Sequence, residues 1–100
     1  LRKDALILQE AGCFGLVLEK IPAQLAKEVS ESLEIPTIGI GAGKHCDGQV
    51  LVMHDMLGMG KYTKFAKVYF DAGAALKTAF EQYVHEVKAG EFPTPEHAFE

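Results

Sequence analysis

The most reactive candidate residue in this sequence is a glutamate that ends an apolar run. Glu19 directly follows residues 14–18, which read FGLVL. A carboxylate that ends a buried strand is partly shielded from water, and shielding raises its pKa and makes it a better general base near neutral pH. Two structural alternatives remain open, because the carboxylate could pair with Lys20 or cap the next helix. The position makes Glu19 the candidate catalytic base.

A glycine-rich turn is the second candidate. Gly41, Ala42 and Gly43 follow the apolar run at residues 37–40. The pattern lacks the dinucleotide-binding fingerprint, because Lys44 stands where the last glycine should be, and the P-loop spacing is also wrong. Glycine lets a backbone turn sharply or lets a ligand approach closely, and we keep both interpretations for these three residues. Such a turn could hold a phosphate through its backbone N–H groups.

Two further clusters carry side chains that can bind ligands or metals. His54 and Asp55 follow the apolar run at residues 49–53, where they could orient each other or a ligand, although a structural hydrogen bond is the commoner role. The loop 45–47 reads His-Cys-Asp, but adjacent residues rarely point at one ion and no second cluster has the spacing of a structural zinc site. We therefore predict no metal ligand in this chain.

The elements that position these residues alternate along the chain. Short apolar runs predict strands near residues 14–18, 37–41 and 49–53. Amphipathic spacing predicts helices near residues 2–11, 23–33, 62–71 and 74–89, with Gly12 and Gly90 as helix ends and Pro22 as a helix start. The order predicts an α/β fold with a parallel sheet. The connection at residues 41–48 is short for parallel neighbours, which usually need a longer crossover.

Composition restricts the class of protein. The 100 residues are 48% hydrophobic and 24% charged, which is typical of one soluble globular domain over residues 1–100. The net charge of -4 gives no basic patch for nucleic acid. No apolar stretch is long enough to cross a membrane, and Cys13 and Cys46 are expected to be reduced thiols in the cytoplasm. The chain opens at Leu1 inside a helical pattern, which indicates a segment of a larger fold.

Three strands do not close a barrel, yet the candidates follow a barrel's rule. In β/α-barrels the active groups stand at the C-terminal ends of strands, which is where Glu19, the glycine turn and His54-Asp55 occur. A parallel sheet fragment has two unpaired edges, which aggregate unless they are covered. We therefore expect either further chain or a second copy beside this sheet.

Several segments together resemble one family, ketopantoate hydroxymethyltransferase. They are LVLEKIP at residues 16–22, IPTIGIGAG at 35–43, DGQVLVMHD at 47–55, KFAK at 64–67, and the tail from Gly90 to Phe99. The resemblance covers essentially the whole chain. It implies the C-terminal part of a (β/α)₈ TIM barrel in a homo-oligomer, a decamer in this family. The stretch at residues 58–63 looks shorter than the family's glycine-rich loop.

The resemblance also implies a reaction. The family transfers a hydroxymethyl group from 5,10-methylenetetrahydrofolate to 3-methyl-2-oxobutanoate and gives 2-dehydropantoate for pantothenate synthesis. Its proposed general base falls on Glu19. Its Mg²⁺ ligands belong to the N-terminal barrel half, so we expect that half to be needed and this chain alone to be inactive. Two alternatives remain, namely a non-catalytic barrel fragment and another barrel enzyme that binds oxo acids or phosphates.

Overall fold

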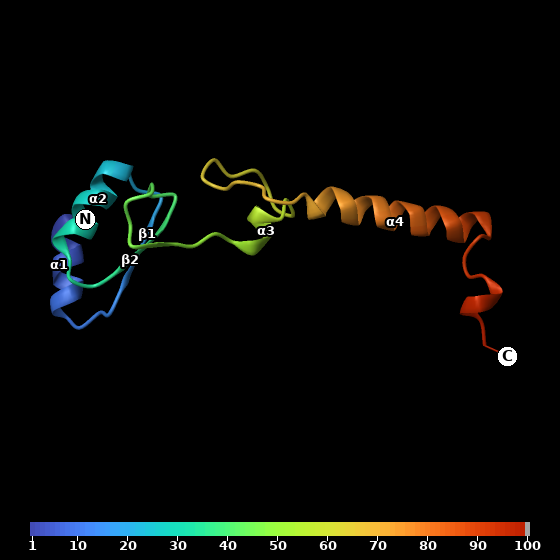
Figure 1. The fold of residues 1–100 in the computed structure, drawn as a ribbon, viewed down its shortest axis with the longest axis horizontal. Coiled ribbons are helices and arrows are strands. Elements are labelled where there is room, and N and C mark those ends of the chain that lie inside the picture. The colour runs from blue at the N-terminus through green and yellow to red at the C-terminus, as the bar shows by residue number, and fades with distance from the viewer. Residues whose placement is uncertain (100) are drawn as a thin grey trace. The chain divides into compact units, whose positions relative to one another are not determined.

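The computed structural model describes residues 1–99, in which two units can each be described separately (Figure 1). The first unit contains residues 1–52 together with the short segment 63–66. The second unit contains residues 53–62 and the chain from residue 67 onwards. The candidate residues Glu19 and Gly41 to Gly43 lie in the first unit, and His54 and Asp55 lie in the second.

The first unit is built on a parallel sheet with the strand order β1-β2-β3. Strands β1 (Leu16–Glu19) and β2 (Thr37–Ile40) pair in parallel, from Leu16 beside Thr37 to Glu19 beside Ile40. Helix α2 (Ala23–Ser32) connects them, and helix α1 (Arg2–Glu10) precedes β1. The predicted α/β class with a parallel sheet is confirmed. The three strands make a sheet segment, and the complete barrel stays a prediction.

A small apolar core joins the helices to the sheet. Its buried members come from α1, β1, α2 and the glycine turn, and they are Ala5, Leu18, Ala26, Val29 and Ala42. Helix α2 shows the apolar face that its sequence predicted, because Val29 is fully buried while Leu25 and Leu33 pack against the core. Burial of this stripe, rather than helix propensity alone, stabilises such a short helix.

An exposed ion pair adds a connection between the first two helices. Arg2 in α1 donates from both its Nε and its Nη2 to the Oε2 of Glu28 in α2, and the Nε distance is 3.0 Å. The hydrogen bond from Arg2, followed by one from Gln24, lowers the pKa of the Glu28 carboxyl. Because both partners are exposed, we assign this pair a minor share of the stability.

The third strand is shorter than the sequence predicted. We expected a strand near residues 49–53, but β3 contains only Gly48–Gln49, and helix α3 (Met53–Met56) begins where the strand was to end. Strand β3 pairs in parallel with β2, with Ile38 beside Gly48, and Val50 adds one hydrogen bond from its N–H to the oxygen of Gly39. Within residues 1–99 no strand pairs with the outer edge of β3, so nothing extends the ladder.

The prediction of a helix near residues 62–71 is wrong. This stretch is irregular, and no helix lies between α3 and α4. The N–H of Tyr69 donates to the oxygen of Met56, and the N–H of Ala72 donates to the oxygen of Leu57. Asp71 has a non-helical backbone (φ -87°, ψ 74°) and caps the following helix instead. The apolar residues that suggested a helix therefore belong to an irregular segment.

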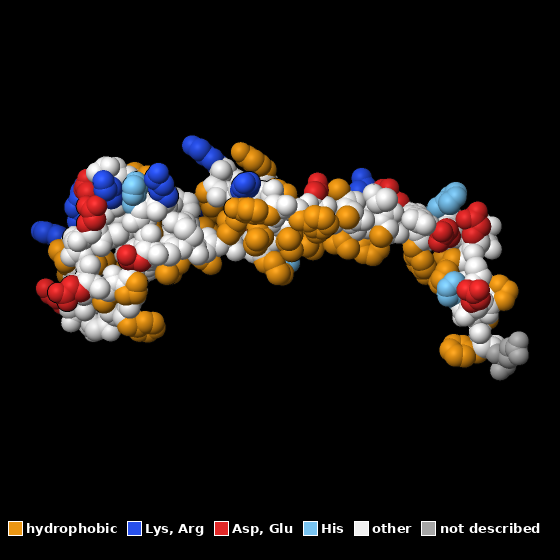
Figure 2. Space-filling view, viewed as in Figure 1, with side chains coloured by type: hydrophobic (Ala, Val, Ile, Leu, Met, Phe, Trp, Pro, Cys, Tyr) orange, Lys and Arg blue, Asp and Glu red, His pale blue; other side chains and the backbone are white. Residues whose placement is uncertain are grey.

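The last long helix is confirmed. Helix α4 spans Ala72–Ala89, starting slightly earlier than predicted, and ends at Gly90 in the left-handed conformation expected there. A short 3₁₀ turn, η1 (Pro95–His97), follows. The predicted apolar face exists but is exposed in this chain, and Figure 2 shows hydrophobic side chains gathered along α4. None of the helices in residues 1–99 has the length and apolarity that a membrane-spanning segment needs.

Candidate active site

The C-terminal ends of β1 and β2 bring two of the predicted site elements together. Glu19 is the last residue of β1 and stands in register with Ile40, the last residue of β2. The N–H of Lys20 donates to the oxygen of Ile40 at 2.9 Å, so Glu19 and the turn that starts at Gly41 are neighbours. Lys20 has a φ of 51°, which is uncommon for a residue with a side chain. The chain therefore leaves the sheet abruptly after Glu19.

The Glu19 carboxylate is available but not enclosed. Its side chain is exposed, so residues 1–99 do not supply the shielding that the sequence predicted. Neither structural alternative is found, since no hydrogen bond or ion pair joins Glu19 to Lys20 and no side chain caps the start of α2. Lys20 instead places its ammonium 5.6 Å from the centre of the Phe65 ring. The carboxylate is thus free of competing partners within the described part of the chain.

The glycine turn is tight for two separate reasons. Gly41 and Gly43 have φ values of 64° and 81°, which L side chains rarely adopt. A Cβ at Gly43 would also stand 2.5 Å from the Cβ of Ala23, the first residue of α2. Ala42 between them is buried in the core. The sharp-turn interpretation is therefore supported, and close approach of a ligand to the same backbone stays a prediction.

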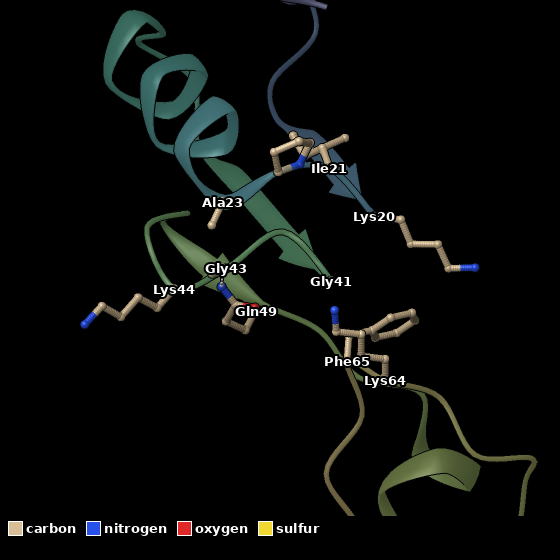
Figure 3. A pocket seen from close by; sticks show the side chains of 10 residues that line it. Lys20, Ile21, Ala23, Gly41, Gly43, Lys44, Gln49, Lys64 and Phe65 are labelled. Atoms are coloured by element: carbon tan, nitrogen blue, oxygen red, sulfur yellow. Dashed lines mark hydrogen bonds between the residues drawn. The ribbon is translucent and has the colours of Figure 1, made fainter.

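An open cavity of about 800 Å³ lies beside this turn (Figure 3). Its walls come from the segment after β1, the glycine turn after β2, and residues 64–65, all within the first unit. Three lysines line it, namely Lys20, Lys44 and Lys64, and Phe65 adds an aromatic ring. No aspartate or glutamate among residues 1–99 is part of the lining. A cavity with this lining has a positive potential and favours anionic ligands.

The start of α2 adds to this potential. Pro22 is the N-cap residue and its side chain accepts no hydrogen bond, so the first N–H groups of the helix have no side-chain partner. Pro22 and Ala23 both line the cavity. The N-terminus of a helix carries a partial positive charge, which stabilises nearby anions. The lysines and the N-terminus of α2 therefore both add positive potential to the cavity.

A hydrogen-bonded clamp holds the loop that carries the glycine turn. Thr37 at the start of β2 is fully buried, and it donates from its N–H (2.8 Å) and its Oγ1 (3.2 Å) to Oδ2 of Asp47. The N–H of Asp47 donates back to Oγ1 of Thr37 at 3.3 Å. Because the Thr37 hydroxyl proton is directed at Asp47, the hydroxyl of Ser30 must be the donor in its 2.6 Å bond to Thr37. Both ends of the loop are thus fixed to β2.

The clamp explains how such a short loop can join parallel neighbours. The sequence made residues 41–48 look too short for a parallel connection, yet β3 does pair in parallel with β2. The positive φ values of Gly41 and Gly43 reverse the chain at once, and Asp47 returns it to the first residue of β2. Asp47, weighed from sequence as a possible metal ligand, therefore has a structural partner.

The other candidate residues are not part of the cavity lining. His45 is exposed, while Cys46 is half-buried with its Sγ 2.8 Å from where a Cβ at Gly39 would stand. His54 and Asp55 lie in α3 of the second unit, and their carbonyl oxygens accept the N–H groups of Met59 and Gly58. No group of three or more metal-binding side chains converges among residues 1–99.

Sequence reasoning missed the residues that make the cavity cationic. In the sequence, Lys44 stands out only as a departure from the dinucleotide-binding fingerprint, and Lys64 and Phe65 only as part of the KFAK segment. Their shared position depends on how residues 63–66 lie against the sheet, because Phe65 packs within 3.0 Å of where a Cβ at Gly41 would be. The available signal was Lys20 directly after β1 and Lys44 directly after the glycine turn, whereas Lys64 follows no strand.

Comparison with known proteins adds independent information. Residues 1–95 match the profile of the family described as ketopantoate hydroxymethyltransferase. Proteins named 3-methyl-2-oxobutanoate hydroxymethyltransferase from Pyrobaculum calidifontis and Trichlorobacter lovleyi are 57% and 60% identical to this chain over 95% and 97% of its length. One from Geobacter metallireducens is 57% identical over 96%. The chain spans only 36% to 37% of the length of these relatives.

Proposed function

The chain belongs to the ketopantoate hydroxymethyltransferase family, and from this premise we propose that it serves hydroxymethyl transfer to 3-methyl-2-oxobutanoate. The donor is 5,10-methylenetetrahydrofolate and the product is 2-dehydropantoate, an intermediate of pantothenate synthesis. The observation that carries the proposal is the position of Glu19, an unpartnered carboxylate at the C-terminal end of β1. Active groups of β/α-barrels occupy that position.

In this proposal Glu19 acts as the general base. Its carboxylate removes the proton from C3 of the oxo acid, which the adjacent carbonyl makes acidic, and the resulting enolate forms a C–C bond to the one-carbon unit of the folate. Both bonds between that carbon and the two folate nitrogens break, and one water supplies the oxygen and the hydrogen of the product's hydroxyl group. One nitrogen takes up the proton that Glu19 removed from C3 and the other takes up the second proton of the water, so tetrahydrofolate leaves. The absence of a competing ion pair leaves the Glu19 carboxylate free to accept the proton.

The parts of the site outside this segment complete the proposal. Among residues 1–99 no three metal-binding side chains come together, and Mg²⁺ would polarise the carbonyl of the oxo acid from a site held by other residues. We place the Mg²⁺ site, and the shielding that the exposed Glu19 lacks, in the N-terminal barrel half expected from the family. We also propose a homo-oligomer, decameric as the family resemblance implies. The exposed apolar face of α4 supports a covered position for that helix in the assembly.

A product assay tests the proposed function on the intact protein, by which we mean this chain together with the N-terminal barrel half that the family resemblance implies. The protein is incubated with 3-methyl-2-oxobutanoate, 5,10-methylenetetrahydrofolate and Mg²⁺, and 2-dehydropantoate is quantified by mass spectrometry. Product should require both substrates, and omission of either one is the control. A folded, intact protein that forms no product under these conditions would contradict the proposal.

One observation favours a second candidate, a barrel enzyme that acts on phosphorylated substrates. The cationic cavity, the glycine turn and the start of α2 are groups that also bind phosphate. In that case phosphorylated oxo acids should inhibit turnover at low concentration and the folate donor should not be needed. Folate-dependent turnover that inorganic phosphate leaves unchanged argues for the first candidate.

A further inference from the structure

We propose that the cavity lined by Lys20, Lys44 and Lys64 binds the glutamate tail of the folate co-substrate, and that it discriminates by the number of glutamates in that tail. This inference rests on the proposed function, because it names the part of the donor that the cavity takes. The tail of a reduced folate is a chain of γ-linked glutamates, each with a free carboxylate. The cavity would therefore bind the donor at its anionic end, while the reacting carbon lies toward Glu19.

The lining of the cavity is positively charged. The lining carries three ammonium groups and no carboxylate from residues 1–99, and the uncapped start of α2 adds partial positive charge. Lys44 and Lys64 are exposed, and neither forms an ion pair with another described residue. Their charges are therefore available to a ligand.

The spacing of these charges favours a chain of anions over a single one. Figure 3 shows Lys20 and Lys44 extending away from each other on opposite sides of the cavity. A single phosphate is held best by donors that converge on one point. Cations that are spread along an opening suit a ligand with repeated carboxylates, of which an oligoglutamate tail is one. The spread of the lysines therefore favours the oligoglutamate tail over inorganic phosphate as the ligand of this cavity.

Size and an apolar wall agree with a large co-substrate. The volume of about 800 Å³ falls within the range of roughly 300–1,000 Å³ that pockets for drug-sized ligands occupy, which is more than a small oxo acid needs. Phe65 lines the cavity, and its ring contacts the glycine turn and lies under Lys20. An aromatic wall of this kind suits the benzoyl ring that precedes the glutamates in a folate.

The cavity lies beside Glu19, so one folate molecule can reach both of them. Lys20 directly follows Glu19, and the backbone of both residues is tied to the end of β2. A donor whose tail lies in the cavity therefore has its remaining part beside the proposed base. Anchoring the tail would orient the one-carbon unit without any contact to the reacting atoms, which is a positioning effect.

The experiment measures binding, so it does not depend on turnover. Dissociation constants of tetrahydrofolate with one and with three glutamates are determined by isothermal titration calorimetry on the intact protein. The variants are the double substitution Lys44→Gln/Lys64→Gln and the control Lys3→Gln, which removes an exposed lysine of α1 away from the cavity. Lys20 is left unchanged because it adjoins the proposed base. Circular dichroism verifies that each variant is folded.

We expect the wild type to bind the triglutamate more tightly than the monoglutamate. The double variant should lose roughly 2- to 30-fold in triglutamate affinity, the usual worth of two exposed ion pairs, and much less in monoglutamate affinity. Lys3→Gln should retain the wild-type preference. Raising the salt concentration should reduce the preference, since the contacts are exposed charges.

Three outcomes overturn the inference. Equal affinity of the wild type for both folates excludes a tail site, and so does an equal effect of the double variant and Lys3→Gln. A third outcome is that inorganic phosphate competes with folate, that this competition depends on Lys44 and Lys64, and that the protein shows no preference for the triglutamate. The cavity would then be a site for a single anion. A lysine-dependent tail preference in a protein that forms no 2-dehydropantoate supports the inference and contradicts only the proposed function.

Discussion

Replacing Asp47 by alanine is expected to destabilise the first unit and loosen the wall of the cavity. Asp47 Oδ2 accepts the N–H of Thr37 at 2.8 Å, and Thr37 is fully buried. Without this acceptor the N–H stays buried and unpaired, which costs about 1–3 kcal/mol. The hydroxyl of Thr37 also loses its 3.2 Å bond to the same oxygen. We therefore expect a loss of about 2–3 kcal/mol for Asp47→Ala, near the top of that range because two bonds end on one atom.

Urea denaturation of the intact protein measures this loss. With a slope of about 2 kcal/mol per molar, the midpoint should fall by about 1 M. Asp47→Asn keeps an oxygen at the same position and should lose only about 1 kcal/mol, the difference between a charged and a neutral acceptor. Asp4→Ala is the matched control, because Asp4 is an exposed aspartate in the first turn of α1.

The Asp4→Ala control should lose about 0.3–1 kcal/mol through its interaction with the helix dipole. If Asp47→Ala costs no more than Asp4→Ala, the hydrogen bonds between Thr37 and Asp47 do not hold the loop.

The substitution of Asp47 should also affect ligand binding. Because the loop contributes Gly43 and Lys44 to the cavity, Asp47→Ala should also weaken folate binding while the midpoint falls.

Two further predictions concern single backbone positions. Gly43→Ala should lose about 2–4 kcal/mol, because its positive φ strains a side chain and its Cβ would also lie 2.5 Å from that of Ala23. Gly12→Ala has a comparable positive φ but nothing within 4 Å, so in urea denaturation it should lose at least about 1 kcal/mol less, and equal losses would contradict the packing argument. Asp71→Ala removes the acceptor of the 3.0 Å bond from the N–H of Ala74 and should cost α4 about 1 kcal/mol. Faster hydrogen exchange in the first turn of α4 measures that loss, and unchanged exchange would refute the cap.

Local patterns were enough to predict the elements whose neighbours lie close in sequence. The apolar stripe of α2, the left-handed Gly90 and the pairing of β1 with β2 all follow from short-range signals and the usual βαβ arrangement. The class of fold followed from their order. These features depend on periodicity and turn chemistry, which a single sequence displays directly.

The errors occurred where distant contacts decide the backbone. Apolar residues near Phe65 and Tyr69 have helical spacing, but Tyr69 donates to Met56 and Asp71 acts as a cap, so the ladder never forms. Val50 and Val52 look like strand residues, yet no neighbouring strand in residues 1–99 extends the ladder beside them. In the first case tertiary hydrogen bonds outweigh local propensity, and in the second case strand propensity alone does not make a strand without a partner.

The position of the candidate site could be predicted from the sequence, but its exposure and its charge could not. Glu19 and the glycine turn were expected at strand ends, and the register places them side by side. The exposure of Glu19 and the three-lysine cavity were not expected, because they depend on which segments approach the sheet. Charge counts along a sequence do not reveal which cations share a cavity.

The central claim is that Glu19 removes the C3 proton, and proton exchange tests it most directly. The intact protein is placed in D₂O with Mg²⁺ and 3-methyl-2-oxobutanoate but no folate, and loss of the C3 proton signal is followed by NMR. Glu19→Gln should slow this exchange by roughly 10²–10⁴-fold, with Mg²⁺ binding unchanged. Glu31→Gln, an exposed glutamate toward the other end of α2, should exchange at the wild-type rate. Wild-type exchange in Glu19→Gln would contradict the account.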